Sequence, residues 1–271
     1  MCYSEKVQLI TGLIIIVVSV LYYYVYKLNY KKTNKEWLSR FLNNIIIGFL
    51  CIGGHQLFEF LSLVTGNVKI YKIGLIISIS SMYFFLRSLE VLTNKDIHSK
   101  WSWLLISIVG IHAFLTPMQF MEKNFYLQHL SAFIWAGVWM FLFIYWHICA
   151  INIRKELKTQ KSKRTIIYYL FATVDISFLL SLGYTFLGYF RYSVNVCYDS
   201  PSIWCTFFVI QAFFVPFFLS SFHFTFKRPH HKTKNETKKT IIIILISLLI
   251  LVGLIATLPF FKCLTLKFVF P

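Results

Sequence analysis

The chain alternates long apolar stretches with short polar segments that carry charged or turn-forming residues. Eight apolar stretches can be delimited, at about residues 8–26, 41–64, 71–92, 102–119, 126–150, 165–190, 203–226 and 240–260. They are too long for strands and lack the polar and apolar alternation of an outer-membrane barrel. Since a helix satisfies every backbone hydrogen bond within its own segment, each stretch predicts a transmembrane helix.

This pattern predicts an all-α fold, a polytopic integral membrane protein with about eight helices in one bundle. Of the 271 residues, 58% are hydrophobic and only 14% are charged, and the mean hydropathy is +0.67. Ordinary soluble domains contain about 25% charged residues. The loops are too short to fold independently, so we expect a single transmembrane domain over residues 1–271. The first stretch lacks the cleavage pattern of a secretion signal, and we expect it to remain as a span.

The basic residues are divided unequally between the two sides of this bundle. Of the 27 lysines and arginines, nineteen fall in the loops after the first, third, fifth and seventh stretches, seven fall on the opposite side, and Arg87 lies within a stretch. Basic loops remain in the cytoplasm under the positive-inside rule. The distribution therefore predicts a multi-pass protein of the cell membrane with cytoplasmic odd-numbered inter-helix loops and both termini outside.

The net charge of +17 raises the question of a nucleic-acid partner. The basic residues are spread over short loops at helix ends, where membrane topology and attraction to anionic headgroups account for them. We therefore expect the lipid bilayer and its anionic headgroups as partners, and no nucleic acid. Membrane-protein partners or a homo-oligomer remain open.

Two cysteines, Cys197 and Cys205, share the predicted sixth outer loop. They could form a disulfide if that side of the membrane is oxidising. Cys51 and Cys149 lie within apolar stretches and are interpreted as small apolar core residues.

Polar residues at membrane depth carry the functional information, because each costs a few kcal/mol unless it is paired or faces a cavity. In the second stretch, polar or small residues recur at gaps of three and four, which places them on one helix face directed into the bundle. This stripe consists of Asn44, Gly48, Cys51, His55, Glu59 and Ser62. The third stretch has a matching stripe of Gly74, Ser78, Ser81 and Ser88, small residues that allow close helix packing.

The helical rise sorts the polar residues into two layers. The central and outer layer is the candidate ligand or proton site and contains His55, Glu59, His112, Gln119, Asp175 and Gln211, with His129 also toward the outer side. In the fourth stretch, His112, Thr116 and Gln119 are predicted to share one face. The cytoplasmic-end layer contains Arg87, Glu90, His147 and His223.

The two layers differ in what they predict. Arg87 and Glu90 form an i, i+3 pair whose charges can neutralise each other. His147 and His223 can reach the membrane–water interface. Glu59 and Asp175 have no Lys or Arg within a turn of their own helices. Each is therefore protonated and hydrogen-bonded, or paired with His55 or His112. An acid that alternates between such states is a natural proton or cation site.

Three functions fit these residues. The first is a small transporter or ligand-binding membrane protein with a protonatable intramembrane site. The second is a metal-dependent intramembrane lipid hydrolase, in which His55 and Glu59 bind a metal ion with His112 or His129 as the third ligand and a water in the open position. The third is a structural or accessory subunit whose polar residues hold the bundle together. The sequence does not identify a catalytic residue. It implies a cofactor, a metal ion, only for the hydrolase.

Overall fold

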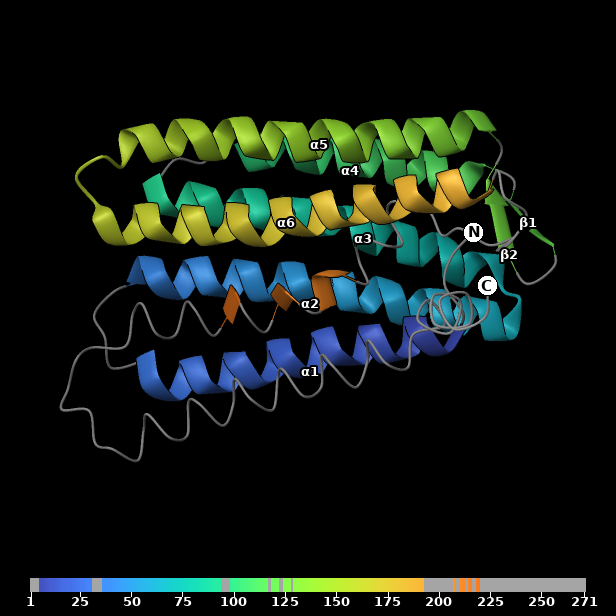
Figure 1. Ribbon diagram of the computed structural model, residues 1–271, viewed down its shortest axis with the longest axis horizontal. Helices are drawn as coiled ribbons and strands as arrows, with labels where there is room; N and C mark the ends of the chain where they lie inside the picture. Colours follow the sequence, from blue (N-terminus) through green and yellow to red (C-terminus); the bar gives the residue numbers. More distant parts are fainter. Residues whose placement is uncertain are drawn as a thin grey trace.

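The computed structural model describes residues 5–30, 36–93, 98–116, 118–121, 124–127 and 129–192, together with helical positions 207, 210–212, 214–215 and 218–219. This part of the chain contains six long helices and one short hairpin (Figure 1). The elements are α1 (Glu5–Tyr30), α2 (Glu36–Thr65), α3 (Val68–Thr93), α4 (His98–Leu115), β1 (Met118–Met121), β2 (Asn124–Leu127), α5 (His129–Glu156) and α6 (Lys161–Tyr192).

Five of these helices are long and apolar enough to cross a membrane. The qualifying segments are Lys6–Tyr26, Glu36–Thr65, Val68–Thr93, Gly137–Glu156 and Lys161–Leu182, and Trp101–Leu115 in α4 is a shorter apolar helix. The first six apolar stretches are therefore helical over most of their length, but the end of the fourth lies in β1 and the start of the fifth lies in β2. The seventh stretch is represented by scattered helical positions, and the eighth, 240–260, lies outside the described residues.

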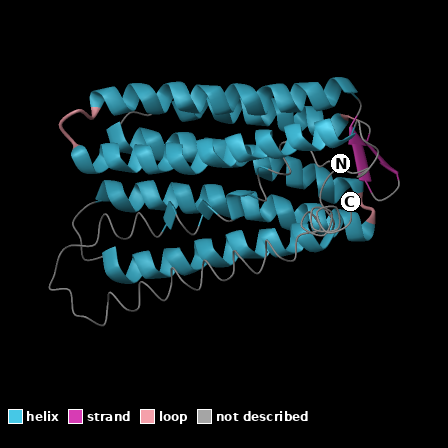
Figure 2. Cartoon of the chain, in the orientation of Figure 1, coloured by secondary structure: helices cyan, strands magenta, loops and turns pink. Residues whose placement is uncertain are grey.

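The fourth apolar stretch ends earlier than predicted. Helix α4 stops at Leu115, and the chain then forms β1 and β2, an antiparallel pair in which Met118 faces Leu127 (Figure 2). The sequence has a proline at position 117, which disfavours helical geometry at the residue before it. The prediction that Gln119 continues the helical face of His112 was therefore wrong, because Gln119 lies in β1.

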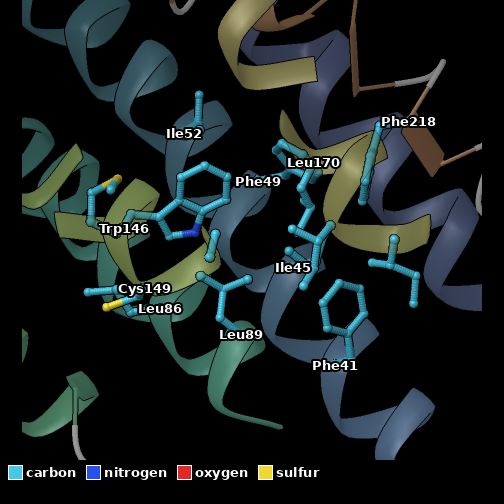
Figure 3. Packing of buried hydrophobic residues seen from close by; sticks show 14 of the residues in the cluster. Phe41, Ile45, Phe49, Ile52, Leu86, Leu89, Trp146, Cys149, Leu170 and Phe218 are labelled. Carbon is cyan, nitrogen blue, oxygen red and sulfur yellow. The ribbon is translucent and has the colours of Figure 1, made fainter. Parts of the chain in front are cut away.

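Helix α3 is the central element of the described bundle, because it contacts α2, α4 and α5. Helix α2 in turn lies between α1 and α3, as Figure 1 shows. Isoleucine side chains of α2 and leucine side chains of α3 pack in one cluster with Trp146 of α5 and Leu170 of α6 (Figure 3). The bundle is thus joined by one continuous apolar core.

A two-residue turn joins α2 to α3. Gly66 has a φ of 64°, in the left-handed region that a residue with a Cβ rarely adopts, and this geometry ends α2. The side-chain oxygen of Asn67 accepts a hydrogen bond of 2.9 Å from the backbone N–H of Lys69 at the start of α3. The two helices therefore run antiparallel and close together, which brings His55 beside Gly74.

Helices α1 and α2 approach most closely at Gly12 and Gly53. A Cβ atom on Gly53 would lie 2.8 Å from Cγ1 of Ile16 and 3.1 Å from the carbonyl oxygen of Gly12. Only a glycine fits at this contact without displacement of the neighbouring helix.

The outer surface of the helices is apolar. Leu21 of α1, Leu115 of α4 and Leu179 of α6 are 57%, 79% and 65% exposed. An apolar surface of this kind is unfavourable in water and suits contact with lipid or another protein.

Candidate functional site

The imidazole of His55 and the carboxyl of Glu59 lie inside the bundle, where they are only 4% and 1% exposed. They are separated by one turn of α2, and Nε2 of His55 is 3.6 Å from Oε2 of Glu59. Nδ1 of His55 donates a hydrogen bond of 3.0 Å to the carbonyl oxygen of Gly74 on α3. The sequence-predicted inward orientation of these two residues is confirmed.

The bond to Gly74 determines the proton arrangement of the pair. Because Nδ1 carries the proton that is donated to the carbonyl, Nε2 is the nitrogen that faces Glu59. One further proton, held either by the carboxyl or by Nε2, gives either a neutral imidazole and acid or an imidazolium and a carboxylate. Both states have no net charge. Loss of that proton would leave a net negative charge in a buried site, which is costly without a compensating cation.

Two buried glutamines, Gln8 of α1 and Gln56 of α2, were missed in the sequence. Gln56 follows His55 on α2, and its side-chain oxygen lies 3.2 Å from the hydroxyl of Thr11 on α1. Among the residues that the structure describes, Oε1 and Nε2 of Gln8 have no hydrogen-bond partner. The same is true of Nε2 of Gln56. The i, i+3 spacing of Gln8 and Thr11 in the first apolar stretch is the signal that could have revealed this polar face.

A second histidine and carboxylate pair joins α5 to α6. Nε2 of His147 lies 2.5 Å from Oδ1 of Asp175, and Nδ1 of His147 donates to the carbonyl oxygen of Phe143 at 2.8 Å. The ring of Phe171 stacks on the imidazole at 5.5 Å between centroids. The sequence predicts different layers for His147 and Asp175, and it leaves Asp175 either protonated and hydrogen-bonded or paired with His55 or His112. The pairing of Asp175 with His147 is therefore a correction.

The layer assignment failed because depth was counted from apolar boundaries along each helix. Helix α5 extends to Glu156, beyond the predicted boundary at residue 150, and α6 begins at Lys161, before residue 165. His147 therefore lies further from the end of its helix than the apolar pattern indicated.

The predicted pair of Arg87 and Glu90 is confirmed. Nη1 of Arg87 lies 3.2 Å from Oε2 of Glu90, whose side chain is 2% exposed. Neutralisation within one turn of α3 explains how this carboxylate is accommodated in the core.

Two lysines bind the ends of neighbouring helices, a role the sequence did not indicate. Nζ of Lys72 donates to the carbonyl oxygens of Phe114 and Thr116 at the end of α4, at 2.8 and 2.6 Å. Nζ of Lys163 donates to the carbonyl oxygen of Leu92 at the end of α3, at 2.8 Å. A positive charge at the C-terminal end of a helix is favourable because that end carries partial negative charge.

The serine stripe of α3 is buried, and the hydrogen bonds that its hydroxyls donate in the described part of the chain stay within α3. Ser78, Ser81 and Ser88 donate to the carbonyl oxygens of Leu75, Ser78 and Phe85 in their own helix, at 2.8, 2.6 and 2.7 Å. These serines therefore serve as small residues that permit close helix packing.

The remaining candidates do not join the His55 and Glu59 pair in the described structure. Nε2 of His112 lies 3.4 Å from the hydroxyl of Thr116, next to its own helix. Gln119 lies in β1 and His129 begins α5, but their side chains are outside the described part. His223, Cys197 and Cys205 also lie outside the described residues. Gln211 is buried and faces a small internal cavity.

A metal site requires at least three converging ligands. Within the described residues, no group of three His, Cys, Asp or Glu side chains is close enough to hold a metal ion. Of the four predicted metal ligands, the structure brings together only His55 and Glu59.

Comparison with known proteins does not assign the chain to a family. No protein-family model, no curated protein and no solved structure significantly matches the chain.

Proposed function

We propose that this chain is a small multi-pass transporter or ligand-binding protein of the cell membrane, in which His55 and Glu59 form a protonatable intramembrane site. The observation that carries the proposal is the burial of this pair, 3.6 Å apart and 4% and 1% exposed, in a bundle of apolar helices. Ionisable groups at such a position are costly and commonly belong to proton or ion pathways.

The proton arrangement of the pair supplies a mechanism. While either His55 or Glu59 holds this second proton, the site has no net charge. When the proton leaves, the buried negative charge favours entry of a cation or a positively charged solute. Exchange of a proton for such a species keeps the site neutral, which is the physical basis for coupling their movements. Gln56, the residue after His55 on α2, is also buried, and its Nε2 has no hydrogen-bond partner among the described residues.

The proposed topology follows the distribution of charge. It has eight spans, cytoplasmic odd-numbered loops and both termini outside. The last turn of α5 with Arg154 and Lys155, and the α5–α6 connection with Lys158, then face anionic headgroups on the cytoplasmic side. The turn at Gly66 faces outward.

The test is proton movement in liposomes that contain the purified protein and a trapped pH-sensitive dye. Gradients of amino acids, sugars, monocarboxylates, polyamines and monovalent cations are imposed one class at a time. We expect one class to drive proton movement, and Glu59→Gln to reduce that movement at least tenfold because the amide cannot exchange a proton.

Ser62→Ala is the matched control for this substitution. Ser62 lies on the same buried face of α2, and its hydroxyl donates to the carbonyl oxygen of Glu59 at 2.7 Å. This variant should retain wild-type proton movement. Equal proton movement in wild type and Glu59→Gln would refute the proposed role of Glu59, and no movement with any class would refute coupled transport.

The other two functions give different outcomes in the same preparation. A metal-dependent hydrolase would contain a stoichiometric metal ion, measurable by elemental analysis, that is lost in His55→Ala. A structural subunit would show neither metal nor coupled movement, and Glu59→Gln would alter only its stability.

A further inference from the structure

The connection between α5 and α6 is anchored to the bundle. Figure 1 shows it at the end of the bundle opposite the β1–β2 hairpin. Leu157 is buried in the apolar core, and its backbone N–H donates to the carbonyl oxygen of Ile153 at 3.0 Å. The backbone N–H of Gln160 donates in turn to the carbonyl oxygen of Leu157 at 3.0 Å. The basic residues on either side of this connection therefore have defined positions.

Arg154 reaches from the last turn of α5 onto one face of α6. Its Cζ atom lies 5.6 Å from the ring centroid of Tyr168. Lys161, Arg164 and Tyr168 follow one another at gaps of three and four, so their side chains share this face. Three cations from two helices, Arg154, Lys161 and Arg164, therefore gather on the face of α6 that carries Tyr168. We call these three residues the basic cluster.

No carboxylate neutralises the basic cluster within the described residues. None of the ion pairs in this part of the chain includes Arg154, Lys161 or Arg164. Glu156 is two residues from Arg154, and positions two apart on a helix do not face each other. Like charges on neighbouring positions of a helix face repel each other. A ligand group with two or more negative charges would remove this repulsion.

The face of α6 that carries the basic cluster continues as an exposed apolar strip. Its members recur at gaps of three and four and are all exposed: Tyr168, Ala172, Ile176 and Leu179. They belong to the segment Lys161–Leu182, which is long and apolar enough to cross a membrane. Asp175 lies on the same helix with its carboxyl in contact with His147. An acyl chain can therefore lie along α6 while its headgroup contacts the cations.

We propose that the basic cluster binds the headgroup of a membrane lipid that carries two or more phosphate groups, and that an acyl chain of this lipid follows the exposed strip of α6. Charge complementarity selects the phosphates, and the continuity of the cluster with the strip selects a lipid over a free phosphate compound. The inference rests on the membrane placement of α5 and α6 in the proposed function. It is independent of proton exchange at His55 and Glu59.

The test is native mass spectrometry of the purified full-length protein in a non-ionic detergent. Phosphatidylinositol bisphosphate, phosphatidylserine and free inositol trisphosphate are titrated separately, and the bound fraction is read from the mass of the complex. The bisphosphate lipid should bind about tenfold more tightly than either of the other compounds. Phosphatidylserine carries only one phosphate group, and inositol trisphosphate has no acyl chain.

Paired substitutions locate the site. Arg154→Gln with Arg164→Gln should weaken binding of the bisphosphate lipid about twenty-fivefold, because each basic residue near an anionic surface contributes about fivefold. Lys6→Gln with Lys69→Gln is the matched control, since it removes two charges from exposed positions of α1 and α3. This control should bind like wild type. Arg154→Lys with Arg164→Lys retains the charge and should bind within about threefold of wild type, because lysine also binds phosphate.

Each outcome decides for or against the site. Equal binding of the bisphosphate lipid and phosphatidylserine by wild type would overturn it, and so would equal losses in the Arg154 and Arg164 glutamine variant and its control. Binding of free inositol trisphosphate as tight as that of the lipid would assign the cluster to a soluble phosphate compound. Lipid binding by a protein that moves no protons would support this site and refute the transport proposal alone.

Discussion

Nε2 of His147 on α5 lies 2.5 Å from Oδ1 of Asp175 on α6. The same proton arrangement occurs at His55, where Nδ1 also donates to a backbone carbonyl and Nε2 faces a carboxyl group. The bundle therefore contains two buried or half-buried imidazole and carboxyl pairs in the same tautomeric arrangement. One lies within a helix and the other joins two helices.

The bond between His147 and Asp175 should couple the stabilities of α5 and α6. A double-mutant cycle with His147→Phe and Asp175→Val should give an interaction free energy of about 0.6–1.7 kcal/mol, the range for polar contacts between membrane helices. The free energy of unfolding is measured in mixed micelles by tryptophan fluorescence. The cycle of His147→Phe with Ser177→Ala should be additive, because Ser177 donates to Thr173 in its own helix at 2.6 Å. An additive His147 and Asp175 cycle would contradict the coupling.

Lys72 should stabilise the end of α4. Lys72→Met removes two hydrogen bonds to the carbonyl oxygens of Phe114 and Thr116 and should lower the free energy of unfolding by about 1–3 kcal/mol. Lys69→Met is the control, because Lys69 lies on the same helix with an exposed side chain. It should change the unfolding free energy by less than about 0.5 kcal/mol. Equal effects of the two substitutions would show that the bonds of Lys72 add no stability.

The contact between α1 and α2 should tolerate no side chain at Gly53. Gly53→Ala places a Cβ 2.8 Å from Ile16 and should destabilise the protein by about 1–3 kcal/mol. The adjacent Gly54→Ala meets its nearest atom, in Ile77, at 3.6 Å and should be neutral or stabilising by up to about 1 kcal/mol through helix propensity. The comparison uses the same unfolding measurement. A Gly53→Ala variant as stable as Gly54→Ala would contradict the close approach.

The proposed orientation predicts opposite labelling of two connections. In a background with all six cysteines replaced, Asn67→Cys on the α2–α3 turn should react with a membrane-impermeant maleimide in intact cells. Gln160→Cys on the α5–α6 connection should react only after permeabilisation. The reverse pattern would invert the topology, and labelling of both positions in intact cells would exclude passage of an odd number of spans between them.

Hydrophobic patterning predicted the helices well because a span needs a long apolar segment, and this requirement appears in a single sequence. It also placed His55 and Glu59 on a buried face, since the side chains of residues four apart on a helix are neighbours. The same rule correctly paired Arg87 with Glu90. These successes all involve contacts within one helix.

The errors involve relations between helices. Whether His147 contacts Asp175 depends on the tilt, the rotation and the neighbours of α5 and α6. The helical period of one sequence segment gives no information on these three properties. The contacts of Lys72 were missed because its charge was attributed to a loop at the end of a span. The burial of Gln8 was missed because the first stretch was interpreted only as an apolar span. The hairpin after α4 is a different kind of error. It was missed because each strand has only four residues and the two strands overlap the ends of the predicted stretches 102–119 and 126–150.

The turn at Gly66 has a consequence for how the protein is made. Helices α2 and α3 can enter the bilayer together as one antiparallel unit, since only two residues connect them. The hydrogen bond from His55 to the Gly74 carbonyl closes within this unit, between residues nineteen positions apart. This hydrogen bond requires no residue of α4, α5 or α6, so it can form as soon as α2 and α3 pack together.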